Sequence, residues 1–379
     1  MTKMMTMTKN RWFTWMSLAF ALTAGLVGCS ALDERQRQFI FNPTISRGGH
    51  NPELQDVWIP FTSRLTSEPV RMHALWRGDA PALIGAKQPV MLYLHGARWD
   101  VWASRTRIER LHEMGFAVLA IDYRGFGKTS SGRREGATPS NTLPSESMAY
   151  EDAMAAWNWL ANRFPKNKRY IYGHSLGGAI AIDLASKVND ESGTIVEGTF
   201  SSVRDVFATT HWGWLPIGPL LTQRFESIDK VQRIGSPLLV VHGSDDEVIK
   251  PELGERLYDA ASSPKEFIMV QGGNHHNASS VGFGQYQAAL KDLFGIQPRP
   301  VADPALARGE AGSALQGVAT QVAAMGAASA TAPATEPVRL RAETKRPLKN
   351  ASGRPLAVKP AATPVASEPR ARSAATSNS

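Results

Sequence analysis

Short apolar runs alternate with amphipathic segments through most of this chain. Runs such as PVMLYL and FAVLAI contain no charged residue, which is typical of strands buried on both faces. The segments between them repeat apolar residues at helical spacing. This order predicts an α/β fold, with a mostly parallel central sheet and helices on both faces. We expect strands over residues 56–61, 70–76, 89–94, 116–121, 170–172, 194–197, 237–242 and 265–270, and helices over 105–114, 145–163, 176–185, 251–261 and 283–294.

The composition separates a C-terminal tail from the rest of the 379-residue chain. Residues 297–379 are rich in Ala, Pro, Ser, Thr and Arg and contain no aromatic residue, so we expect a disordered basic tail. This tail carries a net charge of +6 and the first 29 residues carry +3, so residues 30–296 contribute −1 to the total of +8. The high pI therefore says little about the folded part. We expect a solvated tail, and the alternative is contact with anionic lipid headgroups, cell-wall polymers or nucleic acid. No basic motif interleaved with aromatic residues is present, so no nucleic-acid partner is expected.

The N-terminus has the pattern of an export signal. Basic residues precede an apolar run over residues 12–27, which is short for a membrane span. The run ends Leu26-Val27-Gly28-Cys29, which resembles a bacterial lipoprotein signal peptide over residues 1–28. That resemblance implies a lipid anchor on Cys29, and Ser30 after it implies retention at the outer membrane of the cell envelope. The alternative is an incidental cysteine after a membrane anchor.

Two further expectations follow from the N-terminal pattern. Residues 29–54 are polar enough to predict an irregular spacer between the lipid and the fold. Cys29 is the only cysteine, so the chain has no intrachain disulfide and its core must hold the fold.

The segment over residues 169–185 contains a candidate nucleophile. Gly173-His174-Ser175-Leu176-Gly177 fits G-x-S-x-G, in which a sharp turn between a strand and a helix presents a serine hydroxyl above a sheet. The β-rich run before it and the small residues after it supply that context. Ser175 is therefore predicted to be a nucleophile rather than a surface-loop serine.

A serine nucleophile needs a base and an acid, which in this motif follow it along the chain. The polar loop after residues 237–242 offers Asp245 and Asp246, and the loop after residues 265–270 offers His275 and His276. Both loops follow buried strands, where a parallel sheet gathers functional groups. The residues alone leave open which member of each pair serves. The histidines at 50, 73, 95, 112, 174, 211 and 242 are weaker candidates.

An acyl-transfer site also needs hydrogen-bond donors for a developing oxyanion. We expect one to be the backbone N–H of Leu176, at the start of the helix after the nucleophile. The second should come from the loop after residues 89–94, where His95-Gly96-Ala97 makes Ala97 the expected donor. These groups supply nucleophile, base and charge stabilisation, so no metal and no organic cofactor is expected.

Residues 55–296 resemble the α/β-hydrolase superfamily, and most closely its depalmitoylase-like and lysophospholipase-like serine hydrolases. In this subgroup the spacing after the His-Gly pair selects Asp246, and the pattern G-x-x-H selects His275. The resemblance implies that Asp122 and Arg124 are structural. An inserted segment over residues 128–142 departs from the family and reads as a longer surface loop or a flap. The resemblance rests on residues 94–96, 122–127, 173–178, 242–249 and 272–277.

The connection over residues 199–235 is too long for a plain link between strands. Its apolar stretch HWGWLPIGPLL predicts a small cap over an acyl pocket. The alternatives are that it dips into a membrane surface, where Trp prefers the interface, or that it only packs on the fold. The chain therefore reads as a serine hydrolase that cleaves a carboxylic ester or thioester of a lipid-like or acylated small molecule. The other hypotheses are a serine aminopeptidase-like peptidase and a non-catalytic surface-binding lipoprotein. The sequence does not specify the oligomeric state.

Overall fold

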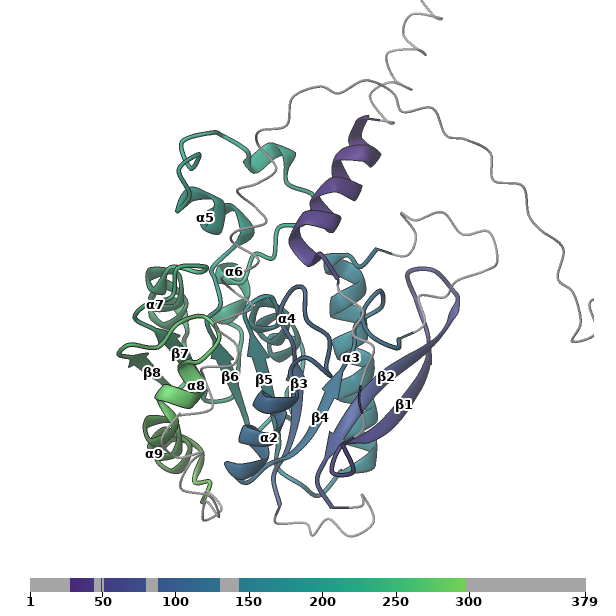
Figure 1. Cartoon of the computed structure of the whole chain (residues 1–379), viewed down its shortest axis with the longest axis vertical. Coiled ribbons are helices and arrows are strands. Elements are labelled where there is room, and N and C mark those ends of the chain that lie inside the picture. The colour runs from purple at the N-terminus through teal and green to yellow at the C-terminus, as the bar shows by residue number, and fades with distance from the viewer. Residues whose placement is uncertain (1–27, 44–48, 50, 80–87, 130–142, 298–379) are drawn as a thin grey trace, which may run out of the picture. The chain divides into compact units, whose positions relative to one another are not determined.

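A parallel sheet forms the centre of this protein. The computed structural model describes residues 28–43, 49, 51–79, 88–129 and 143–297. Its eight strands are ordered β1-β2-β4-β3-β5-β6-β7-β8 (Figure 1). β2 is antiparallel to both β1 and β4, and every other neighbouring pair is parallel. The strands are β1 (Gln55–Thr62), β2 (Pro69–Arg77), β3 (Val90–Leu94), β4 (Ala117–Ile121), β5 (Arg169–His174), β6 (Gly193–Glu197), β7 (Leu238–Gly243) and β8 (Lys265–Val270).

Helices cover both faces of this sheet, as the apolar strands predicted. Every residue of β3 to β7 is buried. One core cluster joins the sheet to α3, α4 and α7, and a second joins its other face to α2 and α9 (Figure 1). The α/β-hydrolase fold expected from the sequence is thereby confirmed. The helices are α2 (Arg105–Glu113), α3 (Glu146–Arg163), α4 (Leu176–Ala185), α5 (Val203–Ala208), α6 (Ile228–Val231), α7 (Pro251–Ala260), α8 (Ala278–Val281) and α9 (Phe283–Phe294).

The positions of α3 and α4 follow from their capping and from their buried residues. Ser145 is the N-cap of α3, as expected, and its hydroxyl accepts a hydrogen bond from the backbone N–H of Met148 (3.2 Å). α3 buries Ala149, Ala153, Ala156, Trp157 and Leu160, which recur at helical spacing. All ten residues of α4 are buried, because this helix lies between the sheet and its neighbours.

The irregular spacer expected over residues 29–54 is wrong for residues 29–41, which belong to a helix over residues 28–41. At the C-terminal end of this helix Phe41 is fully buried, with its ring 5.8 Å from that of Phe225 and 6.4 Å from that of Phe126. The earlier turns dock through polar contacts: the Gln36 side chain bonds to the Leu220 carbonyl at 2.7 Å and accepts from the Thr222 amide at 2.8 Å. These partners lie more than 180 positions away, so no local pattern marks the helix as part of the fold.

The connection between β6 and β7 forms the candidate cap. It contains α5, the short 3-10 helix η2 (Gly218–Leu220) and α6, with loops between them. No helix in the described ranges combines the length and the apolar character that a membrane span requires. The predicted signal peptide over residues 1–28 lies outside the described residues except for Gly28, as does the basic tail except for Gln297. Of the inserted loop only Lys128 and Thr129 are described.

The docking of residues 28–41 predicts a specific pattern of stability losses. Phe41→Ala should lower the free energy of unfolding by about 3–5 kcal/mol, because it empties an aromatic contact in the core. The matched control is Phe39→Ala, since Phe39 is 82% exposed on the same helix and should cost less than about 0.5 kcal/mol. Urea unfolding followed by circular dichroism measures both. Equal losses for the two variants would contradict the docked helix.

Candidate active site

The turn at Ser175 has the strained geometry expected of an exposed nucleophile. Ser175 has φ +56° and ψ −121°, a backbone conformation that residues other than glycine rarely adopt. A Cβ on Gly173 would lie 2.2 Å from the Gly177 carbonyl oxygen, and one on Gly177 would lie 2.1 Å from the Leu94 carbonyl oxygen. Glycine is therefore required on both sides of the serine. The Ser175 amide donates to the Glu197 carbonyl (2.9 Å), which ties the turn to β6.

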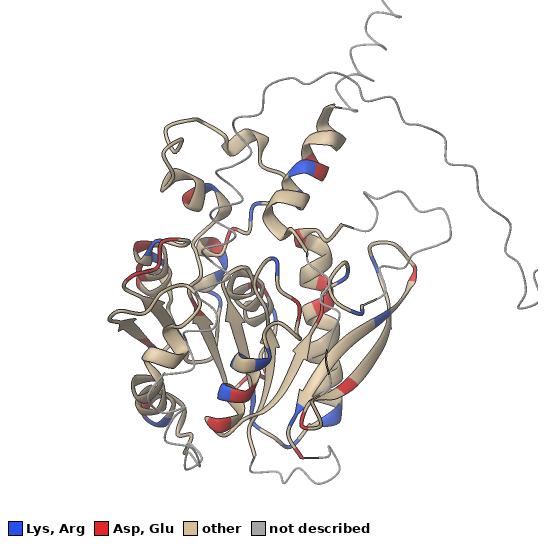
Figure 2. Cartoon of the chain, in the orientation of Figure 1, with Lys and Arg blue, Asp and Glu red and all other residues tan. Residues whose placement is uncertain are grey.

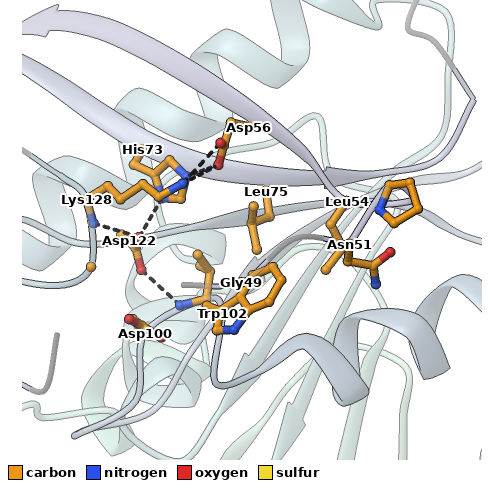
Figure 3. A pocket seen from close by; sticks show the side chains of 13 residues that line it. Gly49, Asn51, Leu54, Asp56, His73, Leu75, Asp100, Trp102, Asp122 and Lys128 are labelled. Carbon is orange, nitrogen blue, oxygen red and sulfur yellow. Dashed lines mark hydrogen bonds and ion pairs between the residues drawn. The ribbon is translucent and has the colours of Figure 1, made fainter. Parts of the chain in front are cut away.

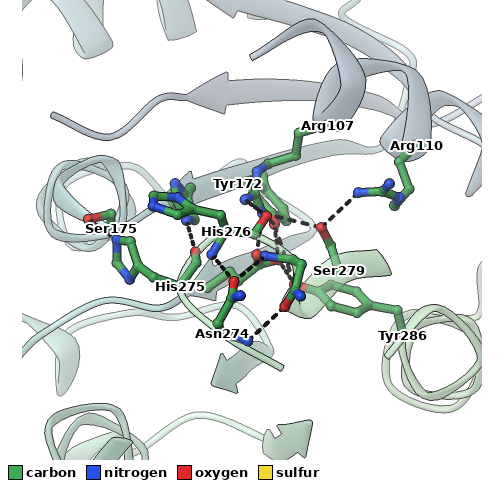
Figure 4. A network of polar contacts seen from close by, with 12 residues as sticks. Arg107, Arg110, Tyr172, Ser175, Asn274, His275, His276, Ser279 and Tyr286 are labelled. Carbon is green, nitrogen blue, oxygen red and sulfur yellow. Dashed lines mark hydrogen bonds and ion pairs between the residues drawn. The ribbon is translucent and has the colours of Figure 1, made fainter. Parts of the chain in front are cut away.

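Three side chains from separate loops meet above this turn (Figure 4 shows Ser175 and His275). Nε2 of His275 lies 3.0 Å from Oγ of Ser175, and its Nδ1 lies 2.7 Å from Oδ2 of Asp246. Because the carboxylate only accepts hydrogen bonds, Nδ1 carries the proton and Nε2 accepts from the serine hydroxyl. The structure thus brings together the three residues that the sequence singled out.

Asp246 is held in its ionised form. Its Oδ1 accepts the amides of Val248 (2.9 Å) and Ile249 (2.8 Å), and its Oδ2 lies 3.3 Å from Nε2 of His242. Burial alone would raise the pKa of this carboxyl, but the hydrogen bonds from His242 and His275 lower it well below its usual value. A carboxylate in this state orients the imidazole and stabilises the imidazolium that forms when His275 takes a proton.

The neighbouring alternatives point elsewhere. Asp245 is exposed, and its Oδ1 accepts the hydroxyl of Ser244 (2.7 Å). His276 is exposed, and its ring stacks on Trp99. His174, inside the elbow, is buried and its Nε2 donates to the His275 carbonyl (2.8 Å). Geometry therefore separates the members of both pairs that the residue types alone left open.

The expected oxyanion donors flank the nucleophile. Leu176 begins α4 directly after Ser175. The loop that carries Ala97 passes close to the same turn, since a Cβ on Gly96 would lie 3.1 Å from the Cβ of Ser175. Among the described residues, neither the Leu176 amide nor the Ala97 amide donates to a protein acceptor. Neither amide is thus engaged by an acceptor in the described part of the protein, and the oxyanion role of the two stays a prediction.

A buried polar network supports the loop that carries His275 (Figure 4). Arg107 of α2 forms an ion pair with Glu197 at the end of β6, and it donates to the His276 carbonyl (3.1 Å). The hydroxyls of Tyr172 (2.5 Å) and Tyr286 donate to the other oxygen of Glu197. Burial alone would raise the pKa of Glu197, but the Arg107 charge and the two tyrosine hydroxyls hold it below its usual value.

Sequence reasoning missed this network because its members come from four elements. Tyr172 read as part of a buried strand and Arg107 as part of an amphipathic helix. The one available signal is the charged residue at the end of an otherwise apolar strand, Glu197, since a buried carboxylate requires partners.

A cavity of about 250 Å³ lies at a different place, among β1, β2 and the loops after β3 and β4 (Figure 3). None of Ser175, Asp246 and His275 lines it. The ring of His73 bridges Oδ2 of Asp122 (2.6 Å) and Oδ1 of Asp56 (2.7 Å). Burial alone would lower the pKa of His73, but these two carboxylates raise it. Asp122 thus joins β4 to β2 and lies outside the serine site.

Arg124 likewise bonds to residues away from Ser175. Its Nε donates to Oδ1 of Asp152 on α3 (2.7 Å), and its Nη2 donates to Oε2 of Glu151 (2.6 Å). It therefore anchors the loop after β4 to a helix. No group of three or more His, Cys, Asp or Glu within the described ranges is arranged to hold a metal ion.

The fold and this site define an α/β-hydrolase with a serine, histidine and aspartate in contact. A family model described as serine aminopeptidase, S33, matches residues 85–225. The described residues have the α/β-hydrolase fold, and over residues 85–225 the chain is similar to this family of hydrolases.

Curated relatives match over part of their length. An uncharacterized protein of Mycobacterium tuberculosis is 32% identical over 199 residues, which cover 52% of this chain and 66% of that protein. Lysophosphatidylserine lipase ABHD12 of Gallus gallus is 29% identical over 231 residues, which cover 56% of each chain. The chain thus spans between about half and two thirds of the relatives that it matches.

Solved structures share the fold. An esterase of Pyrococcus furiosus superposes with a TM-score of 0.51 at 20% identity, over 68% of this chain and 98% of that one. At this level of identity the likeness concerns architecture, and it agrees with the sheet order and the two helical layers described above.

We expect each side chain that bonds to Glu197 to contribute measurably to the free energy of unfolding. Tyr286→Phe should lower the free energy of unfolding by about 1.5–3 kcal/mol, because it removes a hydrogen bond to a buried carboxylate. Arg107→Met should cost about 3–5 kcal/mol, because it leaves Glu197 buried without its cation. The control is Tyr258→Phe, whose hydroxyl has no partner within the described part of the chain and should cost less than about 0.5 kcal/mol. Chemical unfolding of the three variants would refute the network if their losses were equal.

Proposed function

We propose that this protein is an esterase-like serine hydrolase that cleaves acyl esters or thioesters through a covalent acyl-enzyme. The observation that carries the proposal is the unbroken contact from Asp246 through His275 to Oγ of Ser175. A serine hydroxyl is a weak nucleophile, and an adjacent oriented imidazole is what activates it. A protein that only bound ligands would need none of these contacts.

The chemistry follows from the placement of these groups. His275 takes the proton from Ser175 as the serine oxygen attacks the acyl carbonyl, and the amides of Leu176 and Ala97 stabilise the oxyanion. The leaving alcohol or thiol then departs with the proton from His275, which leaves the acyl group on Ser175. Water attacks this ester with His275 again as base, and the carboxylic acid is released as Ser175 recovers its proton.

We propose a lipid-like or acylated substrate. The connection between β6 and β7, with its exposed apolar residues, begins one residue after Gly198, which packs beside the imidazole of His275. A cap in this place suits an apolar acyl chain. The lysophosphatidylserine lipase relatives act, by their name, on a lysophospholipid. The family model's name favours a second candidate, an aminopeptidase-like activity on substrates with a free amine.

Labelling of the full chain in detergent with a fluorophosphonate probe tests the proposed nucleophile. Wild-type protein should label, and Ser175→Ala should not, with ester turnover reduced at least ~10³-fold. Asp246→Asn should slow labelling strongly, because the imidazole loses its orienting carboxylate. The neighbouring Asp245→Asn is the matched control and should label like wild type. A folded wild-type protein that does not label would support the binding-lipoprotein hypothesis instead.

Substrate choice separates the two catalytic candidates. A series of p-nitrophenyl esters of increasing acyl length is compared with aminoacyl amides that carry a free amine. The lipid-like proposal expects faster turnover of medium and long acyl esters than of the acetyl ester, with little turnover of the amides. Preference for the amides would replace it with the peptidase reading.

We also propose that the chain is a lipoprotein of the bacterial cell envelope, anchored through Cys29 and retained at the outer membrane. Cys29 is exposed near the N-terminal end of the helix of residues 28–41, so an acyl anchor there meets no obstruction from the described residues. Radiolabelled palmitate fed to expressing bacteria should appear in the full chain and be absent from Cys29→Ser. Ser30→Ala serves as the control and should label. Label retained on Cys29→Ser would contradict the anchor.

A further inference from the structure

We propose that the helix of residues 28–41 and the loop between α5 and α6 together form a surface that lies in the headgroup region of a lipid bilayer. We call it the tryptophan face, and its exposed apolar side chains are Leu32, Phe39, Trp212, Trp214, Leu215 and Leu220. The proposal concerns where the protein sits and does not depend on its hydrolytic activity.

Two segments far apart in the sequence build this face. The helix bonds to the loop through Gln36 and Thr222, and Asp33 accepts from the side chain of Gln223 (2.8 Å). Figure 1 shows both segments beyond the carboxyl ends of the strands, on the side where Ser175 lies. The face is therefore a joint surface of two docked elements, and its position relative to the nucleophile is fixed.

The exposure of these side chains is unusual for a surface in water. Phe39 is 82% exposed, Trp214 is 74% exposed and Trp212 is 58% exposed. On the helix, Leu32, Arg35 and Phe39 follow each other at spacings of three and four, so they share one side of it. Exposed apolar side chains gathered on two docked segments are typical of an interaction surface rather than of ordinary scatter.

The charge pattern favours a bilayer over a protein partner. Residues 206–223 contain no Asp, Glu, Lys or Arg, and Figure 2 shows this loop in tan. Arg204 and Arg224 bracket the uncharged stretch, and both are exposed. Tryptophan is enriched where hydrocarbon meets water, and flanking arginines suit the phosphates of lipid headgroups.

The course of the chain supplies an independent argument for the same occupant. The apolar run over residues 12–27 leads directly into residue 28, the exposed end of the helix. The link to a membrane rests on the lipoprotein proposed above: an acyl group on Cys29 would tether the first turn of the helix to a membrane.

Quenching by brominated lipid tests the proposal with the full chain. The protein is reconstituted into vesicles of phosphatidylcholine and phosphatidylglycerol, and then into matched vesicles whose phosphatidylcholine carries bromine near the carbonyl end of its acyl chains. Bromine quenches only those tryptophans that enter the bilayer. The fluorescence of Trp212 and Trp214 is obtained as the difference in emission between wild type and the double variant Trp212→Phe, Trp214→Phe. The control difference uses Trp58→Phe, because Trp58 lies on β1 beneath the guanidinium of Arg71.

The expected result is that brominated lipid removes at least half of the emission assigned to Trp212 and Trp214 and leaves that of Trp58 unchanged. Quenching of this emission by acrylamide but not by bromine would place the face in water and overturn the proposal. Quenching by neither would show that protein covers the face, and this also overturns it. Repeating the measurement in Ser175→Ala separates this outcome from the fate of the proposed activity, since the quenching should not change.

Discussion

The active-site geometry depends on one close approach of backbone, at the turn where β5 meets α4. Gly173 and Gly177 lie against other backbone atoms, so the serine between them takes a positive φ that the surroundings must enforce. Part of that enforcement comes from Glu197, whose carbonyl receives the serine amide. The side chain of the same residue holds Arg107, which in turn holds the carbonyl next to His275. One residue at the end of β6 thus connects the turn at Ser175 to the loop that carries His275.

Features that depend on residues close together in the sequence could be predicted, and features that depend on contacts between distant residues could not. Strand and helix positions were confirmed to within a residue or two because continuous apolar runs and the cap at Ser145 are local signals. The glycines around Ser175 are also local, since the turn itself requires them. The choice between Asp245 and Asp246 needed the three-dimensional arrangement, because adjacent residues on a loop point in different directions and only the resemblance to a family favoured one of them.

Contacts between distant segments explain what the sequence could not reveal. The helix of residues 28–41 looked like a spacer because half of its residues are charged or polar. Its contacts with the fold, through buried Phe41 and through hydrogen bonds of Gln36 and Arg37, all reach partners far along the chain. Tyr172 and Tyr286 seemed to be ordinary core residues, since nothing in their neighbourhoods announces a buried carboxylate. In both cases the missing information was the identity of a partner on another element.

Gly198 lies at the boundary between two regions. The residues around Ser175, His275 and Asp246 must keep their shape, whereas the connection from β6 to β7 can change. A Cβ there would come within 3.4 Å of both the imidazole of His275 and the carboxylate of Asp246, and its φ of +57° already favours glycine. The residues that follow leave β6 and return at β7, the adjacent strand, without contributing to the three-residue contact. Insertions and replacements in this excursion can therefore change the surface beside His275 while Ser175, His275 and Asp246 keep their contacts, so the surroundings of the site can vary separately from the site itself.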